Sequence, residues 1–260
     1  MHEMKSDSEP VDLDDFYSSE SPQVWKQIIG ESLHYHSGYY TSMSEASSLE
    51  AGAERVVRLF YPYIEEGATL LDAGCGWGGP GKMLVEDRKV NYTGITISQA
   101  QVDYCQQLGL NVCRKNLETD ELPGSQYDVV VMIEAMQHIM DKQAILAKFR
   151  DCSNRLLLTV NLSRSRDNER VFGGTLKSCS YNQLETYLQR AGWKIDLVRS
   201  RRAESYPTLV LWSNNLKTVY GDETPPGQLR FLRDYVNFAL SRWVDWCPMV
   251  PLVDVVASPA

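Results

Sequence analysis

The chain has no run of apolar residues that approaches the roughly 20 needed to cross a bilayer as a helix. Its first twenty residues are acidic and polar, unlike a secretory signal. The 260 residues carry 26 basic and 34 acidic side chains, a net charge of −8, which opposes binding to a nucleic-acid backbone. We therefore expect a cytoplasmic protein that binds neither membranes nor nucleic acids.

Cysteine and histidine are too scattered to indicate a metal centre. The six cysteines include no C-x-x-C pair. Of the four histidines, His34 and His36 are close in sequence but have no carboxylates beside them. The sequence therefore predicts free thiols in a reducing compartment and no metal site.

The most informative segment is LLDAGCGWGGPG, residues 70–81. A short apolar strand ends there in Asp72, and a glycine-rich turn then opens a helix. Glycine lets the backbone approach a ligand closely, and a helix N-terminus offers free N–H groups to an anion. The segment therefore predicts a site for a nucleotide-like cofactor.

Two glycine spacings overlap in this turn. Gly76, Gly78 and Gly81 fit the dinucleotide pattern G-x-G-x-x-G, which expects an acid roughly 20 residues later. That position reads GITIS, residues 94–98, without an acid. Gly74, Gly76 and Gly78 instead form G-x-G-x-G behind an acid, which resembles the first motif of class I S-adenosylmethionine (SAM) methyltransferases. An NAD(P)-dependent oxidoreductase is the alternative, but the chain also lacks a Tyr-x-x-x-Lys pair.

Strand and helix patterns alternate through the middle of the chain, which predicts a doubly wound α/β sheet with a Rossmann-like arrangement. We expect about seven strands, the last antiparallel, at 69–72, 91–96, 111–114, 127–132, 155–160, 194–198 and 250–257. Helices are expected at 81–87, 98–108, 141–151 and 181–191. Ser98 is a predicted N-cap, and Ser180 with Gln183 has the spacing of a capping box.

The pattern and the resemblance to methyltransferases together divide the chain into five expected parts: a disordered tail (1–15), N-terminal lid helices (16–60), a SAM-binding core (61–202), a helical substrate cap between strands six and seven (203–248), and a final strand (249–260). The lid and the SAM-binding role are what the resemblance implies. An insertion between strands six and seven lies over the carboxyl ends of the strands, where ligands bind. Its many aromatic residues suit a hydrophobic substrate, although ordinary core packing explains them equally well. They also leave room for a symmetric contact such as a homodimer.

The N-terminal part of the chain resembles the N-terminal helices of a small-molecule branch of class I methyltransferases. The resemblance lies in Phe16-Tyr17, Trp25 and residues 33–40. This branch includes tocopherol, sarcosine/dimethylglycine, coclaurine and geranyl diphosphate methyltransferases, and more distantly cyclopropane fatty-acid synthases. The GITIS stretch followed by Gln101 matches another motif of the branch. The resemblance implies SAM as cofactor, with S-adenosylhomocysteine (SAH) as its product, and a lid that closes over it.

The resemblance also implies which residues contact the cofactor. Thr96 and Gln101 would replace the usual ribose acid. Asn116 stands where many relatives carry an Asp for the adenine amino group, and Glu118 is an alternative acceptor. The full implied set is His36, Ser37, Asp72, Ala73, Gly74, Cys75, Gly76, Gly78, Thr96, Ile97, Gln101, Asn116, Leu117, Glu118 and Ile133.

Methyl transfer needs an aligned nucleophile and, for some acceptors, a base. The candidates are Glu134 and His138 after the fourth strand, and His36 and Tyr39 in the lid. Each has a structural alternative: Glu134 could cap a helix or orient the lid, His138 could bond a backbone carbonyl, and the lid residues could contact the cofactor. Gln137 stands where cyclopropane synthases carry a carboxylate, which argues against their chemistry.

The sequence thus predicts an EC 2.1.1 enzyme that methylates a C, N or O atom of a small, hydrophobic or aromatic natural-product metabolite. A SAM-fold protein without methyl transfer, such as a pericyclase or a regulatory subunit, is the alternative. A diphosphate-bearing substrate would need a basic site. Arg164, Arg166 and Arg170 are available for this, as is the cluster Arg199, Arg201 and Arg202, which we otherwise expect to be solvated charges at a strand end.

Overall fold

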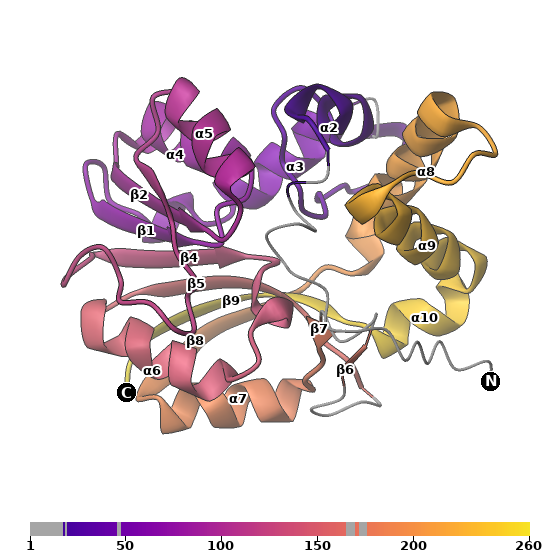
Figure 1. The fold of residues 1–260 in the computed structure, drawn as a ribbon. Helices are drawn as coiled ribbons and strands as arrows, with labels where there is room; N and C mark the ends of the chain where they lie inside the picture. Colours follow the sequence, from indigo (N-terminus) through magenta and orange to yellow (C-terminus); the bar gives the residue numbers. More distant parts are fainter. Residues whose placement is uncertain (1–17, 19, 46–47, 165–169, 172–175) are drawn as a thin grey trace.

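A computed structural model describes residues 18, 20–45, 48–164, 170–171 and 176–260 (Figure 1). The expected tail 1–15 lies outside the described residues. So do Phe16 and Tyr17, which contributed to the family resemblance, and Arg166, one of the candidate diphosphate ligands.

A seven-stranded sheet with the order β3-β2-β1-β4-β5-β9-β8 forms the centre of the molecule. Neighbouring strands from β3 to β5 run parallel, and β9 pairs antiparallel with both β5 and β8. This confirms the predicted sheet with its antiparallel last strand. The strands are β1 (Thr69–Ala73), β2 (Asn91–Thr96), β3 (Val112–Arg114), β4 (Val129–Ile133), β5 (Leu156–Asn161), β8 (Trp193–Ser200) and β9 (Leu252–Pro259). A short pair not predicted from the sequence, β6 (Arg170–Val171) and β7 (Leu176–Lys177), lies outside this sheet.

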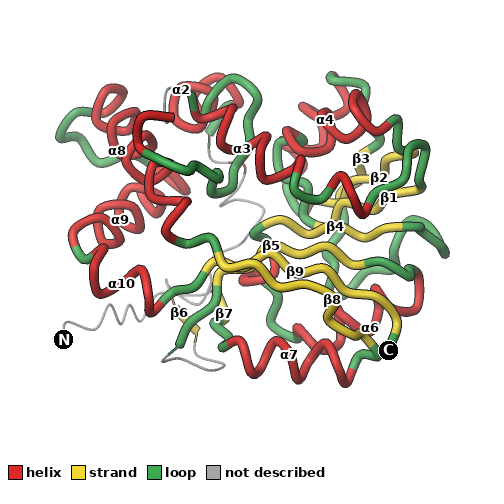
Figure 2. The backbone as a smooth tube through the Cα atoms, turned by 180° about the vertical axis from the view of Figure 1, so that it is seen from behind, coloured by secondary structure: helices red, strands yellow, loops and turns green. Residues whose placement is uncertain are grey.

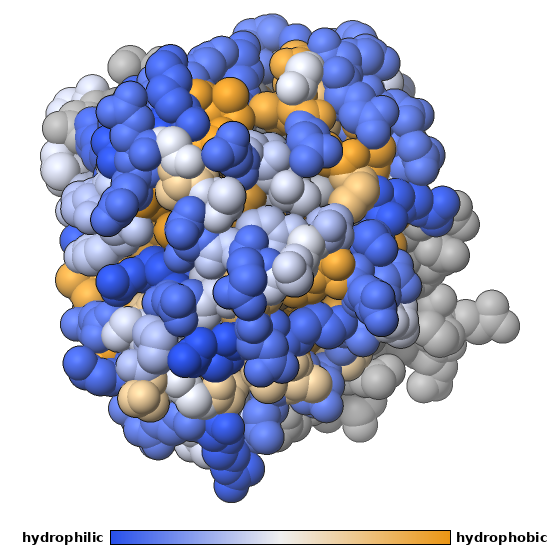
Figure 3. Space-filling view, turned by 90° about the vertical axis from the view of Figure 1, so that its left-hand side faces the viewer, coloured by the Kyte–Doolittle hydropathy of each residue, from blue (hydrophilic) through white to orange (hydrophobic). Residues whose placement is uncertain are grey.

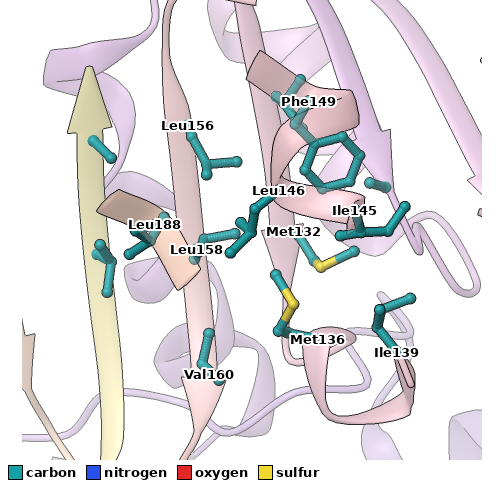
Figure 4. Close-up of a cluster of buried hydrophobic side chains, with 14 of the residues drawn as sticks. Met132, Met136, Ile139, Ile145, Leu146, Phe149, Leu156, Leu158, Val160 and Leu188 are labelled. Carbon is teal, nitrogen blue, oxygen red and sulfur yellow. The ribbon is translucent and has the colours of Figure 1, made fainter. Parts of the chain in front are cut away.

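Helices cover both faces of the sheet (Figures 1 and 2). Strand β4 is buried along its whole length and reads VVVMI, a continuous apolar run typical of a strand covered on both sides. One face packs against α6 (Lys142–Cys152) and α7 (Tyr181–Arg190), and Figure 4 shows their side chains meeting those of β4 and β5. The other face packs against α3 (Leu49–Arg58), α4 (Gly79–Arg88) and α5 (Gln99–Gln107).

The helix starts follow their capping residues. Ser98, Asp141 and Ser180 each accept a hydrogen bond from the backbone N–H three residues later. The capping box at α7 is only half formed, because the side-chain oxygen of Gln183 has no hydrogen-bond partner. Helix α4 begins at Gly79, earlier than the expected Gly81, because Pro80 is compatible with a first helical turn.

A helical cap lies between β8 and β9 in the chain, as predicted from the sequence. It comprises η4 (Ala203–Ser205), α8 (Tyr206–Tyr220), α9 (Gly227–Ser241) and α10 (Trp243–Met249). Helix α2 (Pro22–Ile29) packs against α8, so the N-terminal segment and the cap lie side by side (Figures 1 and 2). A third apolar cluster joins them and includes Trp25, Trp212 and Trp77 of the glycine turn.

The face of the molecule drawn in Figure 3 is mainly polar. In Figure 3 hydrophilic residues predominate, with hydrophobic ones visible between them. Among the residues that the structure describes, no helix is both long and apolar enough to span a membrane.

Candidate functional site

The glycine turn after β1 has the backbone conformation that its sequence predicts. Gly74, Gly76 and Gly78 adopt φ angles of 92°, 54° and 79°, a region that other residues rarely occupy. The N–H groups of Gly74 and Cys75 both donate to the carbonyl of Ile95 at 2.9 Å, which ties the turn to β2. A Cβ atom on Gly76 would meet no atom within 4 Å, so this residue borders space that a ligand can occupy.

Asp72, in β1, is a buried acid with a single described side-chain partner. Its carboxylate accepts a hydrogen bond from the Tyr92 hydroxyl at 2.9 Å, and the residue is 2% exposed. Burial raises the pKa of Asp72 to about 7, and the bond from Tyr92 opposes that shift. A cation placed beside this carboxyl would favour its ionised form, so Asp72 suits a positively charged ligand group.

The end of β2 carries a hydroxyl and an amide in place of an acid. The Thr96 hydroxyl donates to the Gln101 side-chain oxygen at 2.5 Å, and both residues are buried. Ser98 caps α5 between them. The structure thus brings Thr96 and Gln101 together at the strand end, with Ile97 in the connection.

The two candidate adenine acceptors already have hydrogen bonds within the protein. The Asn116 side-chain oxygen accepts from the N–H of Glu118 at 2.9 Å. The Glu118 carboxylate accepts from the N–H groups of Met140 and Asp141 at 3.0 and 2.8 Å. The Asn116 oxygen retains a second lone pair, and the Glu118 carboxylate retains its second oxygen, because both bonds go to Oε1. The adenine role of both residues stays a prediction. Leu117 lies between them and is buried in the core.

Residues 36–40, which we term the lid segment, form no helix but are bonded to several elements. The segment includes the candidate residues His36, Ser37 and Tyr39. Its N–H groups reach the side chains of Glu134 and Thr208 and the carbonyls of Gly52 and Glu204. The preceding residues lie against the start of α4, since a Cβ on Gly79 would approach the Ser32 carbonyl to 2.5 Å.

Glu134 connects the end of β4 to this lid segment. Its carboxylate accepts from the N–H and the hydroxyl of Ser37, at 2.7 and 3.2 Å, and from the Asn161 amide at 2.9 Å. Its backbone φ of 49° is unusual for a residue other than glycine. Ile133, which precedes it, is 9% exposed at the end of the strand.

The histidines differ in their surroundings. His34 Nδ1 and His36 Nε2 lie 3.1 Å apart and both residues are buried. Burial, with the nearby positive charge of Arg201, lowers the pKa of His36 to about 3, so its ring is neutral. His138 ends a short 3₁₀ turn directly after β4 and is half-buried. Outside the lid segment there are thus two candidate bases after β4: Glu134, which directly follows the strand, and His138, four residues further on.

The expectation of solvated charges at residues 199–202 is wrong for two of the three arginines. Arg201 and Arg202 are 0% and 3% exposed. Arg202 donates to the Val250 carbonyl at 2.7 Å and lies over the Trp246 ring at 4.7 Å, because the cap covers the end of β8. Arg201 bonds Asp254, which sequence reasoning missed. An acid inside the apolar run 250–257 was the available signal.

The cysteines give no indication of nucleophilic chemistry. All six thiols are free. A hydrogen bond with Cys105, together with burial, raises the pKa of the Cys75 thiol well above its usual value, which keeps it protonated. Within the described residues, no three His, Cys, Asp or Glu side chains gather as a ligand set for a metal ion.

The sheet order, its antiparallel last strand and the glycine turn after β1 define a class I SAM-dependent methyltransferase. The family model described as mycolic acid cyclopropane synthetase matches residues 8–160, more than half of the chain, and the chain belongs to that family. This family assignment argues against the NAD(P)-dependent alternative.

Individual proteins agree with this assignment. Cyclopropane mycolic acid synthase 2 of Mycobacterium bovis is 23% identical over 283 residues, covering 92% of this chain and 93% of its own. An O-methyltransferase of Penicillium expansum is 25% identical over 82% of this chain and 83% of its own. The crystal structure of the [4+2]-cyclase SpnF superposes with a TM-score of 0.78 at 18% identity, covering 94% and 93% of the two chains, which shows a shared fold.

The residues present fit SAM, whose sulfonium supplies an electrophilic methyl group. Gly76 leaves open space at the turn, and Asp72 is an acid whose ionisation an ammonium group would favour. We propose that Asp72 holds the ammonium group and that Thr96 and Gln101 bond the ribose hydroxyls.

Cofactor affinity should therefore depend on pH. Because the pKa of Asp72 is raised to about 7, a falling pH protonates the free protein and weakens binding of an ammonium-bearing ligand. We expect SAH to bind about tenfold more weakly at pH 6 than at pH 8, as measured by isothermal titration calorimetry.

Two variants test this origin of the pH dependence. Tyr92→Phe removes the bond that lowers the pKa of Asp72, so the midpoint should move to higher pH. Asp72→Asn should remove the pH dependence. A slope that persists in Asp72→Asn would assign the titration to another group. His36 is no alternative, because its lowered pKa puts its titration below this range.

Proposed function

We propose that this methyltransferase acts on a C, N or O atom of a small hydrophobic or aromatic metabolite of the natural-product type. The observation that carries the proposal is the third apolar cluster. It joins the N-terminal helix α2, the cap helices and Trp77 of the glycine turn, so apolar and aromatic side chains border the cofactor loop.

The aromatic rings near the lid segment and in the cap favour such a substrate. Tyr35 lies 4.9 Å from Trp25 and 5.9 Å from Trp212, measured between ring centroids. In the cap, Trp243 packs on Tyr206 at 4.7 Å and on Trp246 at 5.7 Å. Aromatic faces bind flat apolar molecules and also favour a neighbouring cation such as a sulfonium.

Amines and phenols are better supported as acceptors than prenyl diphosphates. A diphosphate needs free cationic groups, whereas the guanidinium groups of Arg201 and Arg202 are buried and bonded to protein acceptors. Of the other arginines considered for this role, the structure describes the side chains of Arg164, which is exposed, and Arg199, which is partly exposed. Gln137 is a neutral amide whose nitrogen bonds the Glu134 carbonyl. The carboxylate of the cyclopropane synthases is missing there, which disfavours their reaction.

We assign the two residues after β4 different roles. The Glu134 carboxylate already accepts three hydrogen bonds, two from the lid segment, which favours a lid-holding role over proton abstraction. His138 then becomes the proposed proton acceptor for substrates whose nucleophile must lose a proton. His36 and Tyr39 are proposed to cover the cofactor.

Replacing these residues should have separable effects. His138→Ala should lower kcat by roughly 100-fold to 10,000-fold, the usual contribution of a general base, with little change in the KM for SAM. Glu134→Gln should mainly raise the KM for SAM. Steady-state kinetics with the best acceptor would measure both, and a loss confined to KM in His138→Ala would make that residue a cofactor-positioning group.

The proposal is tested by incubating the purified protein with SAM and a panel of phenols, amines and prenyl diphosphates. SAH formation and the mass of a methylated product would be measured by liquid chromatography and mass spectrometry. We expect turnover with at least one phenol or amine. Binding of SAM without product over the whole panel would instead favour a protein that uses the fold for other chemistry, as in the cyclase of similar structure.

A further inference from the structure

Arg201 occupies an unusual position for a charged residue. It follows β8 directly, and its N–H donates to the Leu252 carbonyl at 2.8 Å, so the β9 ladder fixes its backbone. Its side chain is completely buried. A buried cation is costly unless it is paired and hydrogen-bonded, so the partners of this guanidinium define its role.

One side of the guanidinium is anchored in the sheet. Its Nε lies 2.9 and 3.1 Å from the two carboxylate oxygens of Asp254 on β9. Asp254 also accepts from the Thr159 hydroxyl at 2.9 Å, and the Thr159 carbonyl accepts from the N–H of Glu134 at 2.8 Å. Thr159 thus links the anchor of Arg201 to the strained residue Glu134.

The other side of the guanidinium leaves the sheet and reaches the lid segment. Nη1 donates to the carbonyl of Ser37 at 2.9 Å and to that of Gly38 at 3.3 Å. The N–H of the same Ser37 donates to Glu134. Glu134 and Arg201 therefore hold one lid residue by its donor and its acceptor at once.

Pairing with Asp254 alone would not require the guanidinium orientation that the structure shows. Nη2 lies 3.9 Å from the Glu134 carboxylate and makes no hydrogen bond, so the guanidinium orientation does not satisfy all its own donors. The guanidinium is instead oriented toward the carbonyls of Ser37 and Gly38. Because its N–H groups are charged, these hydrogen bonds are stronger than those from a neutral donor.

We propose that Arg201 is a positioning residue that keeps the lid segment closed over the cofactor, acting through Ser37 and Glu134. This proposal rests on the proposed function in one respect, the role of the lid segment as a cofactor cover. Closure would exclude water from the methyl group and slow the release of SAH.

The test compares Arg201→Met with Arg155→Met. Arg155 likewise pairs with an aspartate, Asp196 of β8 at 3.1 Å, and its described hydrogen bonds and ion pair involve no residue of the lid segment. Hydrogen exchange of the full-length protein without ligand would be followed at residues 36–40. We expect at least about tenfold faster exchange there in Arg201→Met, with unchanged exchange in β1 and β4, and no change at residues 36–40 in Arg155→Met.

A second readout uses the cofactor. Arg201→Met should raise the SAH dissociation rate and the KM for SAM by about tenfold, the scale of one lost charge-assisted hydrogen bond, whereas Arg201→Lys, which keeps the charge, should restore part of both. Arg201→Lys also serves if Arg201→Met fails to fold. Lowered thermal stability with unchanged exchange at residues 36–40 and unchanged KM would overturn the proposal. Failure of methyl transfer in the wild type would contradict the proposed function alone, because the exchange experiment needs neither SAM nor substrate.

Discussion

Gly76→Val should abolish the binding of SAM and SAH while the protein remains folded. The wild-type φ of 54° disfavours a β-branched residue, at a cost of roughly 1–2 kcal/mol. No protein atom lies within 4 Å of the new Cβ, so the side chain causes no clash within the chain. It fills the space assigned to the cofactor instead. Isothermal titration with SAH would measure the loss.

Gly221→Val is the matched control for this variant. Gly221 has a φ of 55° and equally open surroundings, but it ends α8 in the cap, far along the chain from the glycine turn. Gly221→Val should lose thermal stability as well, because the φ of 55° and ψ of −125° at Gly221 are a combination that residues other than glycine rarely adopt. Only Gly76→Val should lose SAH binding. Undiminished affinity in Gly76→Val would remove the glycine turn from the cofactor site.

Asp72→Ala should weaken SAM binding by roughly 30-fold to several thousand-fold. Removing one partner of a buried, hydrogen-bonded charge pair costs about 2–5 kcal/mol, and Asp72 is the buried acid at the end of the strand that carries the glycine turn. Its loss also frees the Tyr92 hydroxyl. The effect would be measured as the difference in equilibrium SAM affinity between Asp72→Ala and the wild type at pH 8, where Asp72 is mostly ionised.

Asp128→Ala controls for the loss of an acid that bonds β1. Asp128 accepts from the N–H and the hydroxyl of Thr69, both at 2.7 Å, at the opposite end of the same strand. This variant should lose stability and keep its affinity for SAM. If Asp72→Ala also kept its affinity, the cofactor's ammonium group would have to be held elsewhere.

Much of the fold could be predicted because its signals are local. Continuous apolar runs give β4 and β5, and single side chains such as Ser98 and Asp141 set helix starts. The antiparallel last strand was predictable from the apolar run near the C-terminus. Strand ends differ from the prediction where pairing with a distant strand lengthens a strand. The strand predicted at 194–198 extends to Ser200, because Ser200 pairs with Val253 of β9.

The site could be predicted only where its residues lie close together in sequence. The glycine turn and the Thr96–Gln101 pair each fall within a short stretch, and the structure brings each together as expected. The contacts of Arg201 with Ser37 join residues 164 positions apart. No local pattern encodes such a pair, which explains why the buried arginine was expected to be solvated.

The most direct test of the account is a thermal-shift comparison of the purified protein with SAM, SAH, NADH and NADPH. A ligand that binds only the native state raises its melting temperature. We predict stabilisation by SAM and SAH alone, because we propose that Gly74, Gly76 and Gly78 with Asp72 hold the cofactor. Stabilisation by NADH or NADPH instead would contradict it and assign the site to the overlapping glycines Gly76, Gly78 and Gly81.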